Sequence, residues 1–444
     1  MYLSIKARKR TKSTLDAEPD RISWLPGHVI DQIMSYLPIR DAVRTSVLSR
    51  NWRKKWYTLP NLVFDTKLVP VPAATSGDPL AIIDNKFLQI VDHVLLVHSG
   101  PINMFKFSNV DDLMGEDSLV TNIDRWILHL IGRSIKELVL EVWIDDYYKL
   151  PWCLFSCQSL HSLKLNGCLL KPPTMFEGFR NLKSLDLCLV NIVQDAFENF
   201  ISRCPLLEKL RLREFYGLTQ INIHAPNLKF FEIVGEFEVV TFGNTFQLTT
   251  IVIYSCLELT SNSNQSRSPG CSSNLLKFFD HRPHIQSLEI DGFFLKYLAA
   301  GVLPVKLPTP CINLSFLSLT INFDNMEEIS AALCVFRSSP NLQKLKISAL
   351  RAHVATVPLT PATYCWEDIS SRLVMPFRVR HVTIDGISGT QSELNLIRFL
   401  LLYSLVLEKM IVKPVANVIP ELMKALIRFK RASGEVEVIW KDPS

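Results

Sequence analysis

The chain has 444 residues, enough for about three ordinary domains or for one elongated repeat array. Its 48 Lys and Arg residues against 43 Asp and Glu residues give a formal net charge of +5, which is too small over this length to indicate a nucleic-acid binder. Hydrophobic residues make up 48% and charged residues 20% of the sequence, and this composition excludes a largely disordered or collagen-like chain.

Residues 1–18 are predicted to form a basic flexible tail. Its clustered cations are Lys6, Arg8, Lys9, Arg10 and Lys12. No apolar stretch follows them, so the segment is not a secretory signal. A cluster of this length also fits a nuclear import signal, with a solvated tail as the alternative. We therefore expect residence in the nucleus or the cytoplasm, or in both. The most apolar stretch, 399–407, is far shorter than the ~20 residues of a membrane span, so no membrane partner is expected.

Residues 19–66 are predicted to form a small helical module. One apolar stripe fits a helix that starts near Pro26 and is ended by Pro38; it contains Val29, Ile30, Ile33, Met34 and Leu37. A second stripe of the same period predicts one or two further helices packed on the first; it contains Val43, Val47, Leu48, Trp52 and Trp56. A core of this size is marginal, so we expect some of these residues to pack against a partner or against the rest of the chain.

A linker and the helix leading into the next region are expected at 67–99, because PVPAATSGDP at 70–79 is a poor core former. Beyond it the unit LxxLxL, with other apolar residues allowed for Leu, occurs eleven times, from Ile135/Leu138/Leu140 to Leu407/Met410/Val412. The early steps of 20 to 25 residues match the period of leucine-rich repeats, and two later steps of 37 residues carry insertions at 260–274 and 351–365. We therefore assign leucine-rich repeats to 100–373.

The spacing of the unit predicts how each repeat folds. Its last two apolar residues lie two apart on a short strand and point to one side, so that stacked units share a core. Helical periodicity at 195–204 and 327–336 predicts helices on the opposite, convex side. The fold class is therefore α/β: a small helical module followed by an irregular solenoid.

The N-terminal module resembles an F-box. The resemblance is carried by Leu25-Pro26, Leu37-Pro38 and the run DAVRTSVLSRNWR at 41–53. The agreement is closest to plant F-box proteins with leucine-rich repeats. Residues 374–441, with GISGTQSELNLIRFLL and LLYSLVLEKMIV, look like the FBD region that often follows such repeats, and here continue the array. Gly27 and His28 stand where the family usually has an acidic residue, which is expected to weaken the helix start.

The resemblance implies a non-catalytic subunit of a Skp–cullin–F-box ubiquitin-protein ligase complex. The F-box would bind a Skp-family adaptor, and through it a cullin, while the repeats hold a protein substrate for ubiquitination and proteasomal degradation. The adaptor contacts implied by the match are Leu25, Pro26, Val29, Ile30, Ile33, Leu37, Pro38, Val47 and Trp52. The alternative is a leucine-rich repeat scaffold whose F-box-like module no longer binds the adaptor.

No enzyme motif competes with this interpretation. The sequence has no Gly-rich phosphate loop, no HExxH and no GxSxG, so no catalytic residue is assigned. None of the ten cysteines forms a CxxC pair, and we expect no metal and no cofactor.

The outward-facing neighbours of the repeat leucines are the candidate substrate surface. Eight of these flanking residues are basic and seven acidic, and a mixed face favours a protein partner over a nucleic acid. Aromatic neighbours would supply anchors. The candidate substrate-binding residues are Lys209, Arg211, Arg213, Phe230, Tyr254 and Phe316.

Overall fold

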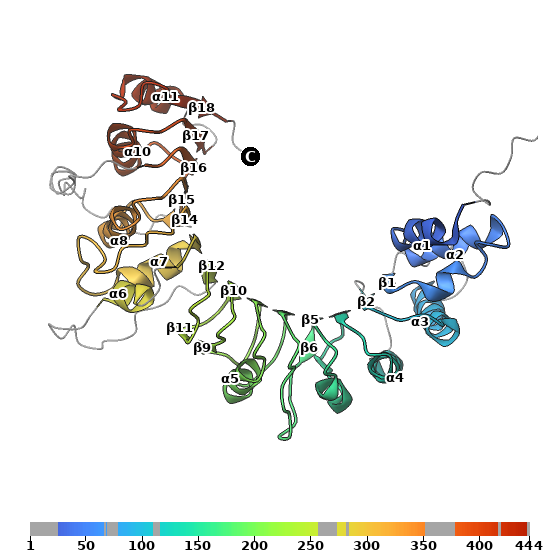
Figure 1. The fold of residues 1–444 in the computed structure, drawn as a ribbon. Helices are drawn as coiled ribbons and strands as arrows, with labels where there is room; N and C mark the ends of the chain where they lie inside the picture. The colour runs from blue at the N-terminus through green and yellow to red at the C-terminus, as the bar shows by residue number, and fades with distance from the viewer. Residues whose placement is uncertain are drawn as a thin grey trace, which may run out of the picture. The chain divides into compact units, whose positions relative to one another are not determined.

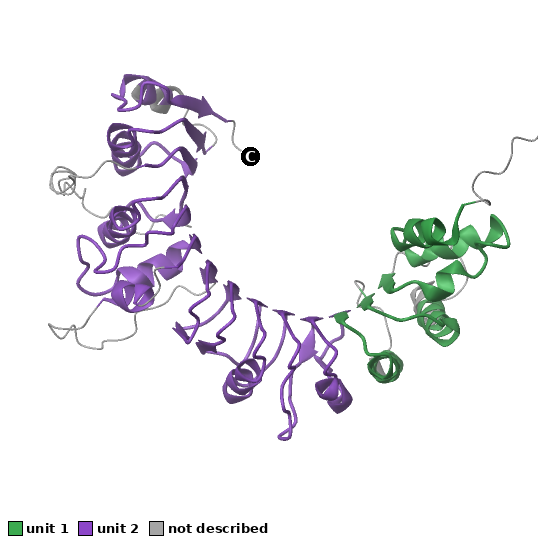
Figure 2. Cartoon of the chain, in the orientation of Figure 1, with its two compact units in different colours: residues 1–139 green, residues 140–444 purple. Residues whose placement is uncertain are grey.

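The computed structural model describes residues 25–65, 68, 79–109, 116–255, 273–280, 284–350, 378–415 and 419–441. The chain divides into two compact units, residues 1–139 and residues 140–444 (Figure 2). The predicted basic tail, most of the linker and the long insertions lie outside the described residues. The predicted α/β class is confirmed, with a helical module at the start and parallel strands alternating with helices afterwards.

The helical module of unit 1 is built from two short helices and two single turns. They are α1 (Gly27–Ser35), α2 (Ile39–Arg44) and the 3-10 turns η1 (Thr45–Val47) and η2 (Lys55–Thr58). Each helix starts directly after a proline, and the carbonyl of Pro26 accepts hydrogen bonds from the amides of Val29 and Ile30. The buried core consists of Ile30, Met34, Ile39, Ala42, Trp52 and Trp56.

The second predicted stripe of this module runs through short helical pieces, not through one continuous helix. The chain leaves the helical path after Arg44, passes through η1 and resumes a single turn only at Lys55. Trp52 and Trp56 are therefore buried, whereas Val43, Val47 and Leu48 are exposed. Three of the five residues of this stripe are therefore on the surface, among them Val47, which was predicted as an adaptor contact.

The rest of unit 1 already has the strand-and-helix alternation of the repeats. It contains β1 (Asn61–Asp65), α3 (Pro79–Val97), β2 (Met104–Ser108), α4 (Glu116–Gly132) and the start of β3 (Glu137–Glu141). β1 and β2 pair in parallel, with Leu62 opposite Phe105 and Phe64 opposite Phe107. The buried triplets Leu59/Leu62/Phe64 and Ile102/Phe105/Phe107 fit the LxxLxL spacing, so repeat-like units begin before the eleven that the sequence search found.

Unit 2 carries a parallel sheet whose strands follow one another in chain order. From β5 onward these strands are β5 (Ser162–Asn166), β7 (Ser184–Cys188), β8 (Lys209–Arg213), β10 (Phe230–Gly235), β12 (Thr250–Ser255), β13 (Ser287–Ile290), β14 (Phe316–Ile321), β15 (Lys344–Ala349), β16 (His381–Ile387), β17 (Lys409–Pro414) and β18 (Glu437–Trp440). The short pairs β4 (Tyr148–Lys149) with β6 (Cys168–Leu169) and β9 (Gln220–His224) with β11 (Val239–Gly243) lie outside this sheet.

Helices cover one side of the sheet in unit 2 and leave the other side open (Figure 1). They are the 3-10 turn η4 (Trp152–Ser156), α5 (Gln194–Ser202), α6 (Asn274–Phe279), α7 (Gly292–Ala299), α8 (Met326–Arg337), α10 (Gln391–Tyr403) and α11 (Ile419–Arg428). The helices predicted at 195–204 and 327–336 are confirmed as α5 and α8. No helix in the described part of the chain is long and apolar enough to cross a membrane.

The repeat units are held together by a shared core and a shared backbone pattern. All three apolar positions of the eleven predicted units are buried, none more than 3% exposed. The carbonyl of His161 accepts hydrogen bonds from the amides of both Lys183 and Ser184, and the carbonyl of Lys183 accepts from both Glu208 and Lys209. The same pattern, one carbonyl that accepts from two successive amides of the next repeat, recurs along the array. It therefore imposes one register along the sheet.

A left-handed residue ends several strands and fixes the turn that follows. Gly167, Leu189 and Glu214 have φ of 71°, 48° and 49°, and each donates its amide to a carbonyl at the end of the next strand. At Gly167 a Cβ would also lie 1.9 Å from the carbonyl oxygen of Val142. Glycine is therefore required there by space as well as by conformation.

We expect Gly167→Ala to destabilise the chain by more than about 2 kcal/mol, because the methyl group collides with backbone and φ is unfavourable for alanine. Gly434→Ala is the control, since no atom lies within 4 Å of its added Cβ, and it should change stability by less than about 0.5 kcal/mol. Chemical denaturation followed by circular dichroism measures both. Equal stability of the two variants would contradict the steric account.

Candidate protein-binding surfaces

The helical module exposes an unusual amount of apolar side chain for its size. Val47 is 87% exposed, Tyr36 79% and Leu48 51%, while Ile33 and Val43 are each 37% exposed. Ile33, Tyr36 and Leu37 are spaced i, i+3, i+4 at the end of α1, which places them on one side of it. Large exposed apolar patches are typical of surfaces that bind another protein.

The structure separates the nine predicted adaptor contacts into two groups. Seven reach the surface: Leu25, Val29 and Leu37 are half-buried, and Pro26, Ile33, Pro38 and Val47 are exposed. Ile30 and Trp52 are only 1% and 3% exposed, because the module's own helices cover them. In this chain these two residues belong to the core of the module, so they present little surface to a partner.

Three further apolar residues of the module are exposed and are not among the predicted contacts. Tyr36 closes α1 as its C-cap, and Val43 and Leu48 flank η1. The sequence offered one signal, because Val43 and Leu48 lie in the run DAVRTSVLSRNWR that carries the resemblance. Their apolar character and helical spacing favoured burial instead.

The start of α1 is held without an acidic residue in its first turn. Pro26, its N-cap, makes no side-chain hydrogen bond, and Gly27 and His28 supply no carboxylate. Lys55 ties η2 to α1 instead: its Nζ lies 2.7 Å from Oδ1 of Asp31 and 3.4 Å from the carbonyl oxygen of Gly27. A cation bound one turn into α1 therefore joins the two parts of the module.

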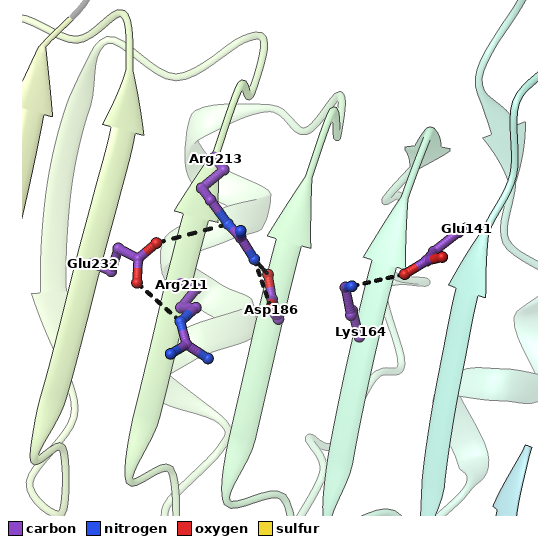
Figure 3. A network of polar contacts seen from close by, with 6 residues as sticks. All are labelled: Glu141, Lys164, Asp186, Arg211, Arg213 and Glu232. Carbon is purple, nitrogen blue, oxygen red and sulfur yellow. Dashed lines mark hydrogen bonds and ion pairs between the residues drawn. The ribbon is translucent and has the colours of Figure 1, made fainter. Parts of the chain in front are cut away.

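The open side of the sheet in unit 2 carries a network of ion pairs. Lys164 Nζ lies 2.7 Å from Glu141 Oε1, and Arg213 Nη2 donates to both carboxylate oxygens of Asp186 at 2.8 Å (Figure 3). Arg211 Nε donates to Glu232 Oε2 at 2.9 Å, and Arg213 Nε lies 3.8 Å from Glu232 Oε1. The hydrogen bond to Asp186 raises the pKa of Arg213 above its ordinary value.

Strand register produces this network. The parallel pairing sets Lys164 opposite Asp186, Asp186 opposite Arg211, and Arg211 opposite Glu232. Opposite charges therefore alternate along one row of the sheet, and such cross-strand pairs stabilise it. The side chains were expected to face outward, and they do, but the structure shows in addition that they neutralise one another.

Phe230 forms the aromatic part of this surface. Lys209 Nζ lies 5.1 Å and the Arg211 guanidinium 4.8 Å from the centre of its ring, both within cation–π range. The other two predicted anchors are further along the sheet. Tyr254 donates to Glu289 at 3.3 Å, and burial, with that carboxylate beside it, raises the pKa of Tyr254 to about 12.

Phe316 does not join the cluster around Phe230. In register it lies three strands away, beyond Thr250 and Ser287. The structure thus brings together Lys209, Arg211, Arg213 and Phe230, and places Tyr254 and Phe316 progressively further along the same face. In the residues that the structure describes, no three His, Cys, Asp or Glu side chains gather to hold a metal ion.

The fold and these surfaces together define a class: leucine-rich repeat proteins preceded by an F-box. Residues 22–64 match the F-box domain model, and residues 123–347 match the model of the LRR repeats of FBD-associated F-box protein At5g56370. The chain is 35% identical over 431 residues to F-box/FBD/LRR-repeat protein At1g13570 of Arabidopsis thaliana, covering 95% of this chain and 98% of that protein. The chain belongs to the F-box/FBD/LRR-repeat protein family.

Shorter matches point the same way. F-box/FBD/LRR-repeat protein At1g78750 of Arabidopsis thaliana is 33% identical over 212 residues, which is 47% of this chain and 45% of that protein. F-box/LRR-repeat protein 13 of the same plant is 32% identical over 215 residues, 47% of this chain and 44% of that protein.

The ion pairs of the strand face allow a direct test of their strength. In a double-mutant cycle, Asp186→Ala and Arg213→Ala should show a coupling energy of about 1 to 2 kcal/mol, because Nη2 of Arg213 donates to both carboxylate oxygens and Asp186 is largely buried. The exposed pair Glu177 and Arg180 is the control and should couple by less than about 0.5 kcal/mol. Equal coupling in both cycles, measured by denaturant unfolding, would show that the network does not stiffen the face.

Proposed function

We propose that this protein is the substrate-recognition subunit of a Skp–cullin–F-box ubiquitin-protein ligase. Its F-box binds a Skp-family adaptor, which links it to a cullin, and its repeats hold a protein substrate. Capture of the substrate leads to its ubiquitination and degradation by the proteasome. The observation that carries the proposal is the exposed apolar surface of an otherwise well-packed F-box module.

That surface has the right chemistry for a stable protein contact. Burial of one apolar side chain of the size of Val or Leu contributes roughly 1.5 to 3 kcal/mol, so a partner that covers several of them gains substantial affinity. The contact surface that we propose comprises Leu25, Pro26, Val29, Ile33, Tyr36, Leu37, Pro38, Val43, Val47 and Leu48.

The strand face of unit 2 fits the second half of the proposal. Both charge signs occur on it in alternation, which suits a folded protein better than a uniformly charged nucleic acid. Lys209, Arg211, Arg213, Phe230, Tyr254 and Phe316 remain the proposed substrate contacts, with Phe230 and its two cations as the central anchor.

In this role the protein performs no chemical step of its own. It holds two partners at separate surfaces, one in each unit, and the transfer of ubiquitin belongs to other subunits. The nuclear or cytoplasmic location remains a proposal, because the basic cluster at 6–12 lies outside the described residues.

The adaptor contact is tested by placing charge on exposed apolar positions. We expect Ile33→Asp with Val47→Asp to weaken capture of a purified Skp-family adaptor by at least tenfold, because two carboxylates would be buried unpaired in an apolar contact. Both side chains are exposed, so the fold should be kept. Pull-down and calorimetry with the full chain measure the effect.

Leu96→Asp with Leu128→Asp is the matched control. Both residues are exposed leucines of unit 1, 83% and 61% exposed, and lie outside the F-box. This variant should capture the adaptor as well as wild type does. If the wild-type chain captures no adaptor, or if the F-box variant captures it unchanged, the alternative of a repeat scaffold without an adaptor is favoured.

A further inference from the structure

The strand face changes character between the central and the C-terminal repeats. From β3 to β10, the carboxylates of Glu141, Asp186 and Glu232 each lie within 2.9 Å of a Lys or Arg nitrogen. On β15 the order is different, because Lys344 and Lys346 are both exposed and stand on the same face of one strand. Among the described residues, no carboxylate lies within ion-pair distance of either ammonium group.

The register extends this cationic surface across two more strands. Lys344 lies opposite His381 of β16, and His381 lies opposite Lys409 of β17, so the three occupy one row. Lys346 stands in the next row beside Thr383 and Ile411. Lys344 and Lys346 are like charges on one face of the same strand, so they repel, and an anionic partner would relieve that repulsion.

The full set of charges on this part of the face leaves an excess of cations. Lys413 lies 3.5 Å from Asp385. Glu408 lies 2.9 Å from Arg380 and 3.8 Å from His381. Glu437 of β18 is opposite Lys409 in register and borders the surface. Lys344 and Lys346 therefore form its least neutralised part.

An aromatic side chain adjoins these lysines. Phe316 of β14 lies directly opposite Lys344 in register and is half-buried, so part of its ring remains open to a partner. A partly open aromatic ring next to Lys344, with Lys346 two residues further along that strand, is suited to a peptide that carries both carboxylates and apolar groups. A nucleic acid calls for a longer stripe of one charge, and Asp385 and Glu437 interrupt such a stripe here.

We propose that the face of β14 to β17 binds an extended acidic segment of the protein substrate, with carboxylates at alternate positions. This inference rests on the proposed function and names the chemistry of the partner. Lys344 and Lys346 are two residues apart on a strand, which separates them by about 6.5 to 7 Å. Alternate side chains of an extended peptide have the same spacing, so Glu residues two apart match the two lysines.

The test uses the full chain and a defined probe, a fluorescein-labelled peptide of four Glu-Ser repeats. Binding is measured by fluorescence anisotropy at about 50 mM NaCl, where screening is weak. We expect Lys344→Glu with Lys346→Glu to weaken binding at least tenfold. We also expect the peptide of four Gln-Ser repeats and a single-stranded oligothymidine to bind at least tenfold more weakly to the wild-type chain.

The control variant is Lys171→Glu with Lys277→Glu, which changes the net charge equally at two exposed lysines elsewhere in unit 2. It should alter the affinity for the Glu-Ser peptide by less than twofold. An equal loss in both double variants, or equal binding of the Gln-Ser peptide, would overturn the site. Tighter binding of the oligothymidine would overturn it in favour of a nucleic-acid partner.

Measuring adaptor capture with the same protein samples distinguishes a failure of the ligase role from a failure of this site. If the wild-type chain binds the Glu-Ser peptide but captures no adaptor, the acidic-segment site stands and the ligase role fails. If it captures the adaptor but binds no peptide, the ligase role stands and this site is overturned. The Lys344→Glu, Lys346→Glu variant should capture the adaptor as wild type does, because its changes lie in unit 2.

Discussion

The stacking of identical apolar triplets is the constraint on which the repeat region depends. Each unit buries three side chains in a core that it shares with its neighbours, and no unit could bury them alone. In each repeat the carbonyl of the residue after the first apolar position accepts hydrogen bonds from two amides of the next repeat, and this sets the register from one strand to the next. Because the leucines are committed to the core, every residue between them on a strand is presented outward.

This register decides the chemistry of the open face. Where it sets acids opposite bases, as along Lys164, Asp186, Arg211 and Glu232, the face is neutralised by its own side chains. Where it sets lysines beside a histidine and a threonine, as at β15 and β16, charge is left for a partner. One rule of backbone pairing thus produces both a stiff, neutral region and an unneutralised cationic one. The F-box differs, because several of the residues that it exposes are apolar: Ile33, Tyr36, Val43, Val47 and Leu48.

The sequence predicts the repeats well because their signal is local. The LxxLxL spacing locates the buried positions, and helical periodicity locates α5 and α8. It does not predict which side chains of the face pair, because Arg213 reaches Asp186 across 27 positions of sequence and only the register brings them together. It does not single out Val43 and Leu48, which are exposed like the predicted contact Val47, since amphipathic spacing cannot distinguish a face covered by the chain from one left for a partner. Ile30 and Trp52 were predicted as contacts but are buried in the module, because motif resemblance cannot tell a core residue from a surface residue.

The central claim is that the F-box surface binds an adaptor while the repeat face stays available. Hydrogen-exchange mass spectrometry of the full chain, with and without a purified Skp-family adaptor, tests it most directly. The account predicts that the adaptor slows exchange in peptides covering 27–48 and leaves the peptides of β8, β10 and β15 unchanged. Unchanged exchange at 27–48, or protection confined to the strands of unit 2, would contradict it.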